Sequence, residues 1–159
     1  MFRKKWFRTG FLFGLFLLLA CFVIPLLSSS SQKYQKEIAQ NIIRFHVIAN
    51  SDSQKDQALK LAVRDAVLKE MNQWVQGSES IEQTRQILTG RLKDIEAIAL
   101  ETLQKEGNEA SVEVSMENTY FPVKMYGSLT FPAGNYEALR IRIGEAKGQN
   151  WWCVLYPPL

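Results

Sequence analysis

The chain has 159 residues, the length of one ordinary domain, and its 19 basic residues outnumber its 16 acidic ones. Four of the basic residues and none of the acidic ones precede residue 32, which leaves 15 basic against 16 acidic residues in the rest. The rest of the chain therefore has no excess positive charge to neutralise phosphates, and we expect no nucleic-acid binding.

Residues 1–31 have the pattern of an export segment. A basic flank, "MFRKKWFRTG", precedes an uncharged apolar run at 11–27, and serines follow at 28–31. This pattern is typical of a secretory signal, and the apolar run is nearly long enough to cross a bilayer core about 30 Å thick. We expect a cleaved signal peptide or a membrane anchor through residues 11–27. In both cases the positive-inside rule places the remaining chain outside the cytoplasm.

A polar stretch then leads into the first strand. Residues 32–40, "QKYQKEIAQ", are predicted to form a tether to a domain at 41–159. The segment 41–50, "NIIRFHVIAN", is rich in β-branched and aromatic residues, which favours a strand.

Two amphipathic helices are predicted next. The first covers about 54–76, where apolar residues recur every three or four positions, and Ser53 with Asp56 has the spacing of a capping box. The second begins at Ser80 and continues to Gly107. Gly90 lies inside the second helix, where glycine costs about 1 kcal/mol relative to alanine.

From Ala110 the apolar period changes from 3.6 to 2, which indicates strands. Clear alternation occurs at 112–117 and 139–143, and "WWCVLY" at 151–156 is the last predicted strand, while the aromatic and proline-rich stretches between them suggest short edge segments. Helices and strands are segregated along the chain. We therefore predict an α+β fold in the order β-α-α-β-β-β, with two helices on one face of a small, mostly antiparallel sheet, preceded by the signal or anchor helix.

One pair of side chains raises the question of catalysis. His46 and Cys153 are the sole histidine and cysteine after residue 31, and such a pair, oriented by Asp52 or Asp65, can generate a thiolate nucleophile. However, Cys153 lies in a hydrophobic strand, where the pKa of a thiol rises, so a buried thiol is the favoured interpretation. The sequence has no metal-ligand spacing and no phosphate-binding loop, and we expect no metal, cofactor or small-molecule substrate.

The adjacent tryptophans near the end of the chain predict a surface feature. Neighbouring residues of a strand point to opposite faces, so Trp151 and Trp152 cannot both lie against the helices. The one on the other face is either part of a protein-binding surface or covered by the proline-rich segments.

Four stretches carry a family resemblance: "RFHVIANSDSQKDQALKLAVRDAV", "FPVKMYG", "FPAGNYEALRIRIG" and "NWWCVLYPPL". In this order and spacing they resemble the stage II sporulation protein R family, and the resemblance extends from about Ile42 to Leu159. It implies a protein exported from the forespore into the forespore–mother-cell intermembrane space, where it triggers a membrane-embedded aspartic-type protease to process the sigma-E precursor.

The family resemblance implies a trigger that is not itself a protease, so there are no catalytic residues to transfer. We expect partner binding within "IANSDS" and "NWWCVLYPP", chiefly at Asn50, Asp52, Trp151, Trp152 and Tyr156. Family sequences typically continue beyond "PPL" with a further cysteine, which would pair with Cys153 in the longer form. This chain is then a truncated product or a shorter natural form.

Three functions follow as alternatives. The chain is an exported protein ligand that activates a membrane protease, a secreted hydrolase that uses Cys153 and His46, or a membrane-anchored structural domain with no signalling role.

Overall fold

The computed structural model describes residues 33–157 except Ser128. The predicted signal or anchor segment, 1–31, lies outside the described residues. Residues 33–40, which are all of the predicted tether at 32–40 except its first residue, are helical, and residues 39–159 form a compact unit of their own. Within the described part of the chain, no helix combines the length and the apolar character needed to span a membrane.

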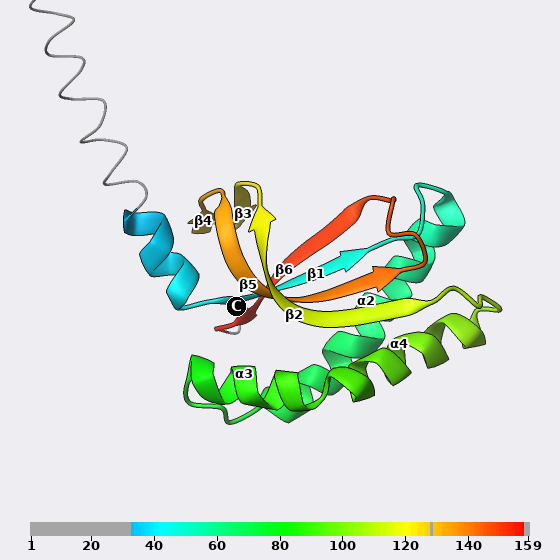
Figure 1. The fold of residues 1–159 in the computed structure, drawn as a ribbon, viewed down its shortest axis with the longest axis horizontal. Coiled ribbons are helices and arrows are strands. Elements are labelled where there is room, and N and C mark those ends of the chain that lie inside the picture. The colour runs from blue at the N-terminus through cyan, green and yellow to red at the C-terminus, as the bar shows by residue number, and fades with distance from the viewer. Residues whose placement is uncertain (1–32, 128, 158–159) are drawn as a thin grey trace, which may run out of the picture. The chain divides into compact units, whose positions relative to one another are not determined.

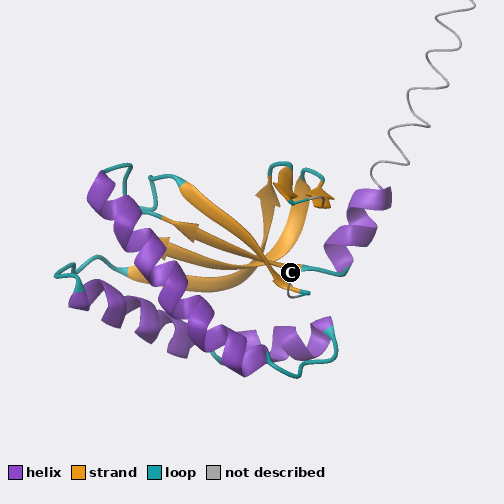
Figure 2. Cartoon of the chain, turned by 180° about the vertical axis from the view of Figure 1, so that it is seen from behind, coloured by secondary structure: helices purple, strands orange, loops and turns teal. Residues whose placement is uncertain are grey.

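After the helix at 33–40, the described residues of the compact unit form three helices and six strands, labelled as in Figure 1. In chain order they are β1 (Ile43–Ile48), α2 (Gln54–Val75), α3 (Ile81–Gly90), α4 (Leu92–Lys105), β2 (Val112–Phe121), β3 (Lys124–Tyr126), β4 (Leu129–Phe131), β5 (Gly134–Ile143) and β6 (Asn150–Tyr156). Figure 2, seen from the other side, shows α2 crossing in front of the sheet, with α4 and α3 along the bottom of the view.

The main sheet has four strands in the order β2-β5-β1-β6. β5 pairs antiparallel with β2 and β6 pairs antiparallel with β1, whereas β1 and β5 are parallel. The short strands β3 and β4 form a separate antiparallel hairpin. The predicted α+β class and the mostly antiparallel sheet are thus confirmed. The segments expected to be short edge segments form the hairpin, and the parallel central pair was not predicted.

The predicted second helix is wrong in one respect, because it is two helices. α3 ends at Gly90, and Arg91 adopts non-helical angles (φ −118°, ψ 19°) before α4 begins. The break places the Arg91 guanidinium 4.7 Å from the centre of the Trp74 ring on α2. A continuous apolar stripe predicts a helix but cannot show that tertiary contacts favour bending it at a glycine with weak helix propensity.

The predicted helix starts are confirmed. The Ser53 hydroxyl accepts a hydrogen bond from the Asp56 backbone N–H at 3.1 Å, and the Ser80 hydroxyl accepts one from Gln83 at 3.2 Å. Each satisfies a backbone donor that the first turn of a helix leaves without an intrahelical partner.

The two faces of the sheet are covered differently. One face packs on α2 and α4 through aliphatic side chains and Phe45, forming a core with these fully buried members: Ile43, Phe45, Val47, Val63, Val67, Met71, Leu88, Ile95, Ala99, Leu103, Leu139 and Ile141. The opposite face carries the β3–β4 hairpin, which lies across the sheet from α3 and α4 (Figure 1). All six residues of β1 are buried, because this central strand is covered on both faces.

Candidate functional site

A buried arginine organises the hairpin-covered face. Arg44 of β1 is fully buried, and its guanidinium carbon lies 4.2 Å from the ring centre of Phe121, 5.1 Å from Tyr136, 5.5 Å from Phe131 and 5.8 Å from Tyr126. We call Arg44 and these four rings the Arg44 cluster. Its Nη2 donates to the Tyr126 hydroxyl at 2.9 Å, while Nε and Nη1 have no hydrogen-bond partner among the described residues. Attraction between the cation and the ring faces therefore substitutes for a carboxylate.

The Arg44 cluster connects the hairpin to the last strand. The Tyr126 hydroxyl donates to the backbone carbonyl of Trp152 at 3.2 Å, so a hydrogen-bonded path runs from Arg44 through β3 to β6. Burial raises the pKa of the Tyr126 phenol, which keeps it protonated and able to donate. This path holds the hairpin in position, because an isolated hairpin of two short strands is marginally stable at best.

His46 and Trp152 stack beside the Arg44 cluster. Their ring centres are 3.7 Å apart with planes 17° from parallel, and Phe121 meets the Trp152 ring edge-on at 4.6 Å. The His46 Nε2–H donates to the Asn150 side-chain oxygen at 2.8 Å. The pKa of His46 is lowered to about 4, chiefly by burial; the Asn150 hydrogen bond opposes this shift and the positive charge of Arg140 contributes to it. His46 is therefore neutral at physiological pH.

Trp151 lies on the helix-covered face, as the alternation of strand residues predicts. Its ring meets Phe45 edge-on at 5.9 Å, and the Arg64 guanidinium of α2 lies 4.9 Å from the ring centre. The two tryptophans therefore point to opposite faces, which confirms that prediction. Trp152 is half-buried, and its ring contacts His46 and Phe121, the residue before Pro122, so the start of a proline-containing segment does cover part of it.

The proposed Cys153–His46 dyad does not form. Cys153 packs against the helix-side core, whereas His46 stacks on Trp152 on the other face, and the register pairs Cys153 with Phe45. Burial raises the pKa of the Cys153 thiol, which disfavours the thiolate. Neither expected orienting acid reaches His46, since Asp65 pairs with Arg64 at 2.7 Å and Asp52 bonds a loop. The sheet separates the two side chains because the pleat alternates them.

Asn50, one of the predicted partner-binding residues, joins two loops of the domain. Its side-chain oxygen accepts from the Glu145 N–H at 3.0 Å, its amide donates to the Asp56 carboxylate at 2.9 Å, and its carbonyl accepts from the Lys147 N–H at 3.1 Å. Hydrogen bonds from Ser51 and then from Asn50 lower the pKa of the Asp56 carboxyl. The side chain of Asn50 is thus fully used inside the molecule.

Asp52 adds hydrogen bonds between the same two loops. Its carboxylate accepts from the Gln149 N–H at 2.7 Å, and the buried Lys60 ammonium donates to the Gln149 carbonyl at 3.1 Å. The two loops approach so closely that a Cβ atom on Gly148 would lie 2.2 Å from the Ser51 carbonyl oxygen. The "IANSDS" stretch therefore locks the turn between β5 and β6 in place.

Tyr156, the fifth predicted residue, lies at the far end of β6. It is half-buried and packs against the helix-side core. Together with Cys153 and Leu155 it lines a cavity of about 550 Å³ beside the second half of α2. Among the described residues, no group of three or more histidine, cysteine, aspartate or glutamate side chains could hold a metal ion.

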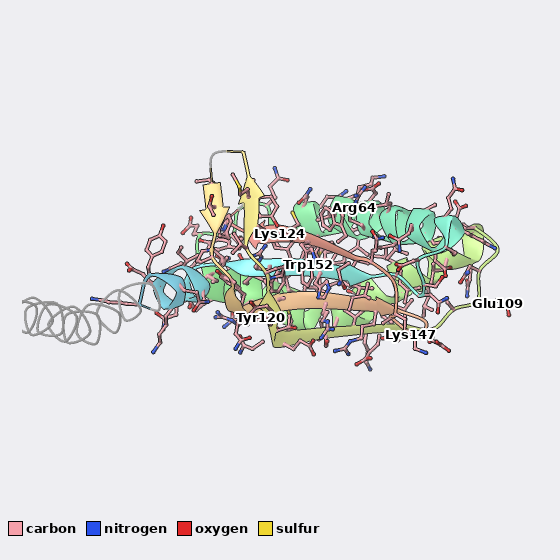
Figure 3. The ribbon with its side chains drawn as sticks, turned by 90° about the horizontal axis from the view of Figure 1, so that it is seen from above. Arg64, Glu109, Tyr120, Lys124, Lys147 and Trp152 are labelled. Atoms are coloured by element: carbon pink, nitrogen blue, oxygen red, sulfur yellow. The ribbon has the colours of Figure 1, made fainter. Side chains whose placement is uncertain are left out.

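The structure reveals an exposed apolar surface that the sequence analysis did not identify. Four large side chains at the end of β2 and on the hairpin are at least half exposed: Tyr120 at 61%, Val123 at 56%, Met125 at 70% and Leu129 at 51%. We call these four residues the hairpin patch; Figure 3 labels Tyr120 and the neighbouring Lys124. The register pairs Leu129 with Tyr126 and Met125 with Thr130, so Leu129 and Met125 point to opposite faces of the hairpin, and apolar side chains are exposed on both. The available signal was "FPVKMYGSLTFP", a mostly apolar stretch in a hairpin too short to bury both of its faces.

Comparison with known proteins identifies the family. The family described as stage II sporulation protein R matches residues 39–159. The curated stage II sporulation protein R of Bacillus subtilis (strain 168) is 44% identical over 149 residues, which cover 91% of this chain and 66% of that relative. The chain thus spans slightly less than two thirds of the relative's length, and no solved structure matches it significantly. The chain belongs to the stage II sporulation protein R family.

Proposed function

We propose that the chain is an exported signalling protein that acts by binding. From the forespore–mother-cell intermembrane space it contacts a membrane-embedded aspartic-type protease of the mother cell and triggers processing of the sigma-E precursor. Family membership supports the role in sporulation, and the basic and apolar pattern of residues 1–31 supports export. The separation of Cys153 from His46 removes the pair on which the hydrolase alternative depends.

The hairpin patch is the observation that carries the proposal. Surface hydrophobic residues scattered singly need no explanation, but four large ones on one short hairpin and the adjoining strand end are typical of a protein-binding surface. The Arg44 cluster fixes the hairpin from beneath, so the patch is held ready for a partner. A preformed surface loses less conformational entropy when it binds.

The hairpin patch offers better positions for testing partner binding than the predicted residues Asn50 and Asp52. The side chains of Asn50 and Asp52 form hydrogen bonds between two loops of the domain. Their substitution would therefore disturb the fold as well as any contact with a partner protein. Val123, Met125 and Leu129 make better test positions, because exposed side chains can be changed with little effect on stability.

The test is co-expression of the full chain with the protease and the sigma-E precursor, followed by measurement of precursor cleavage. We expect a Met125→Asp/Leu129→Asp double variant to reduce cleavage by about tenfold or more, because charges would have to be desolvated in an apolar contact. Leu61→Asp is the matched control, since Leu61 is an exposed leucine (38%) on α2, outside the hairpin patch. Thermal unfolding of each variant checks that the fold is retained.

Two outcomes would count against the proposal. Cleavage that proceeds equally with and without the unsubstituted chain removes the signalling function itself. Undiminished cleavage with the double variant, when the unsubstituted chain is active, removes the hairpin patch as the contact.

A further inference from the structure

The two edge strands of the main sheet differ in how they are protected. β2 carries Glu113 and Glu117, which pair with arginines of β5, and charged side chains on an edge strand discourage another chain from pairing with it. β6, "NWWCVLY", has no charged residue, and within the described part of the chain it pairs with β1 alone. An uncharged edge with backbone donors and acceptors is a template for a further strand.

A groove runs beside this unprotected edge. Leu68, Asn72 and Val75 of α2 face Cys153, Leu155 and Tyr156 of β6 across the cavity of about 550 Å³. Residues four apart share one side of a helix, and residues two apart share one face of a strand, so each element presents a continuous row. Every residue that lines the cavity is uncharged.

The cavity has contacts of α2 with β6 on one side of it and the contact of β6 with the hairpin nearby. Next to Leu68 and Cys153, the Arg64 guanidinium stacks 4.9 Å from the Trp151 ring centre and joins the two rows. Figure 3 labels Arg64 on α2 and Trp152 on β6. The Tyr126 hydroxyl bonds the Trp152 carbonyl, so β6 contacts the hairpin at Trp152 and lines the groove with the residues that follow it, Cys153 to Tyr156.

We propose that the groove between α2 and β6 receives an extended, uncharged segment of the partner protein, with apolar side chains at alternating positions, as a further strand on β6. This inference rests on the proposed function, because it names how the protease would be contacted. An extended backbone would pair the open edge of β6, whereas a lipid chain or a helical surface would leave those polar groups without partners. The uncharged lining selects against a charged segment, because a charge buried there would have no counter-ion.

Asn72→Trp tests the groove directly. Asn72 is exposed and lines the cavity, so an indole at this position fills the space without disturbing the core. We expect at least about a tenfold loss of precursor cleavage in the co-expression system. Gln73→Trp is the matched control, because Gln73 is the next exposed residue of the same helix and does not line the cavity. We expect it to change cleavage by less than about twofold.

Photo-crosslinking identifies the occupant. A benzoylphenylalanine in place of Gln76, which lines the cavity, should crosslink to an uncharged extracytoplasmic segment of the full-length protease in membranes, and the same group in place of Gln73 should not. A crosslink to a second copy of this chain, to lipid, or at both positions equally overturns the inference.

The two proposals fail differently. If the unsubstituted chain triggers cleavage and Asn72→Trp does so equally well, the groove is not the contact, and the proposed function stands. If the unsubstituted chain triggers no cleavage, the proposed function falls, and the assignment of this partner falls with it.

Discussion

The two faces of the main sheet are built from the same strands by opposite means. On the helix-covered face, residues such as Phe45, Val47 and Ile141 pack with aliphatic side chains of α2 and α4. On the hairpin-covered face, Arg44 and His46 of the same β1 strand are buried among aromatic rings, and some of their polar atoms have no hydrogen-bond partner within the described part of the chain. Burial of apolar area stabilises the first face. The second face gains less stability, because buried polar atoms without hydrogen bonds cost free energy.

The two faces therefore have different structural roles. An aliphatic core lacks groups that would orient an exposed segment, whereas the Arg44 cluster holds a six-residue pair of short strands through one cation and one hydroxyl. The hairpin in turn displays the hairpin patch. We therefore expect substitutions on the helix-covered face to reduce stability, and substitutions on the other face to affect mainly the hairpin.

The largest expected effect is on the helix-covered face. Phe45→Ala should lower the free energy of unfolding by about 4 kcal/mol, because it leaves a cavity in a fully buried site and removes the edge-on contact with Trp151. Guanidinium-induced unfolding measures the change, and Tyr120→Ala at an exposed position should cost less than about 0.5 kcal/mol. A loss below about 1 kcal/mol for Phe45→Ala would show that this face does not dominate stability.

Substitution of Arg44 is the corresponding test on the hairpin-covered face. Arg44→Ala should cost about 3 kcal/mol, because it empties the space among the four rings and leaves the Tyr126 hydroxyl without its donor. Arg44→Met should lie within about 1 kcal/mol of the unsubstituted protein, since an apolar chain of similar length fills the space without two unpaired donors. Equal losses in both variants, measured by equilibrium unfolding, would show that the guanidinium itself supplies the stability.

His46 makes the hairpin-covered face sensitive to acid. Burial lowers its pKa from 6.5 to about 4, with Arg140 and Arg142 acting in the same direction and Asn150 and Glu117 against it. The folded state therefore binds fewer protons than the unfolded state between these values. Stability is constant above pH 6.5 with respect to this group and falls by up to about 3 kcal/mol as the pH drops to 4.

Unfolding curves at pH 7, 5.5 and 4 measure this dependence. In His46→Gln, which keeps a donor toward Asn150, the decline between pH 6.5 and 4.5 should disappear. Glu117, whose pKa is lowered from 4.5, loses its contribution only below that value, so the two effects are separable. A full decline in His46→Gln would mean that another group titrates.

The smallest expected effect concerns the glycines at the ends of the helices. Gly90→Ala should raise stability by about 0.5 kcal/mol, because a Cβ atom there meets no atom within 4 Å and alanine restricts the unfolded chain. Gly77→Ala should instead cost about 1 kcal/mol, since Gly77 has a φ of +85°. Thermal unfolding compares them, and destabilisation by Gly90→Ala would show that the break before α4 requires glycine.

Part of the candidate site was predictable because it depends on local periodicity. The alternation of strand residues placed Trp151 and Trp152 on opposite faces, and the spacing of Ser53 and Ser80 located two helix starts. The Arg44 cluster was not predictable, since its members come from β1, β2, β3, β4 and β5. No local pattern tells which distant rings will surround an arginine.

The sequence by itself determined the α+β class, most element positions and which side chains share a face of each strand, because these follow from periods of 3.6 and 2 and from caps within a few residues. Only the tertiary structure decided that β1 lies parallel to β5, that β6 is at the edge of the main sheet and that the hairpin covers Arg44. Strand order and the covering of a face depend on contacts between distant segments, whose energies no local pattern contains.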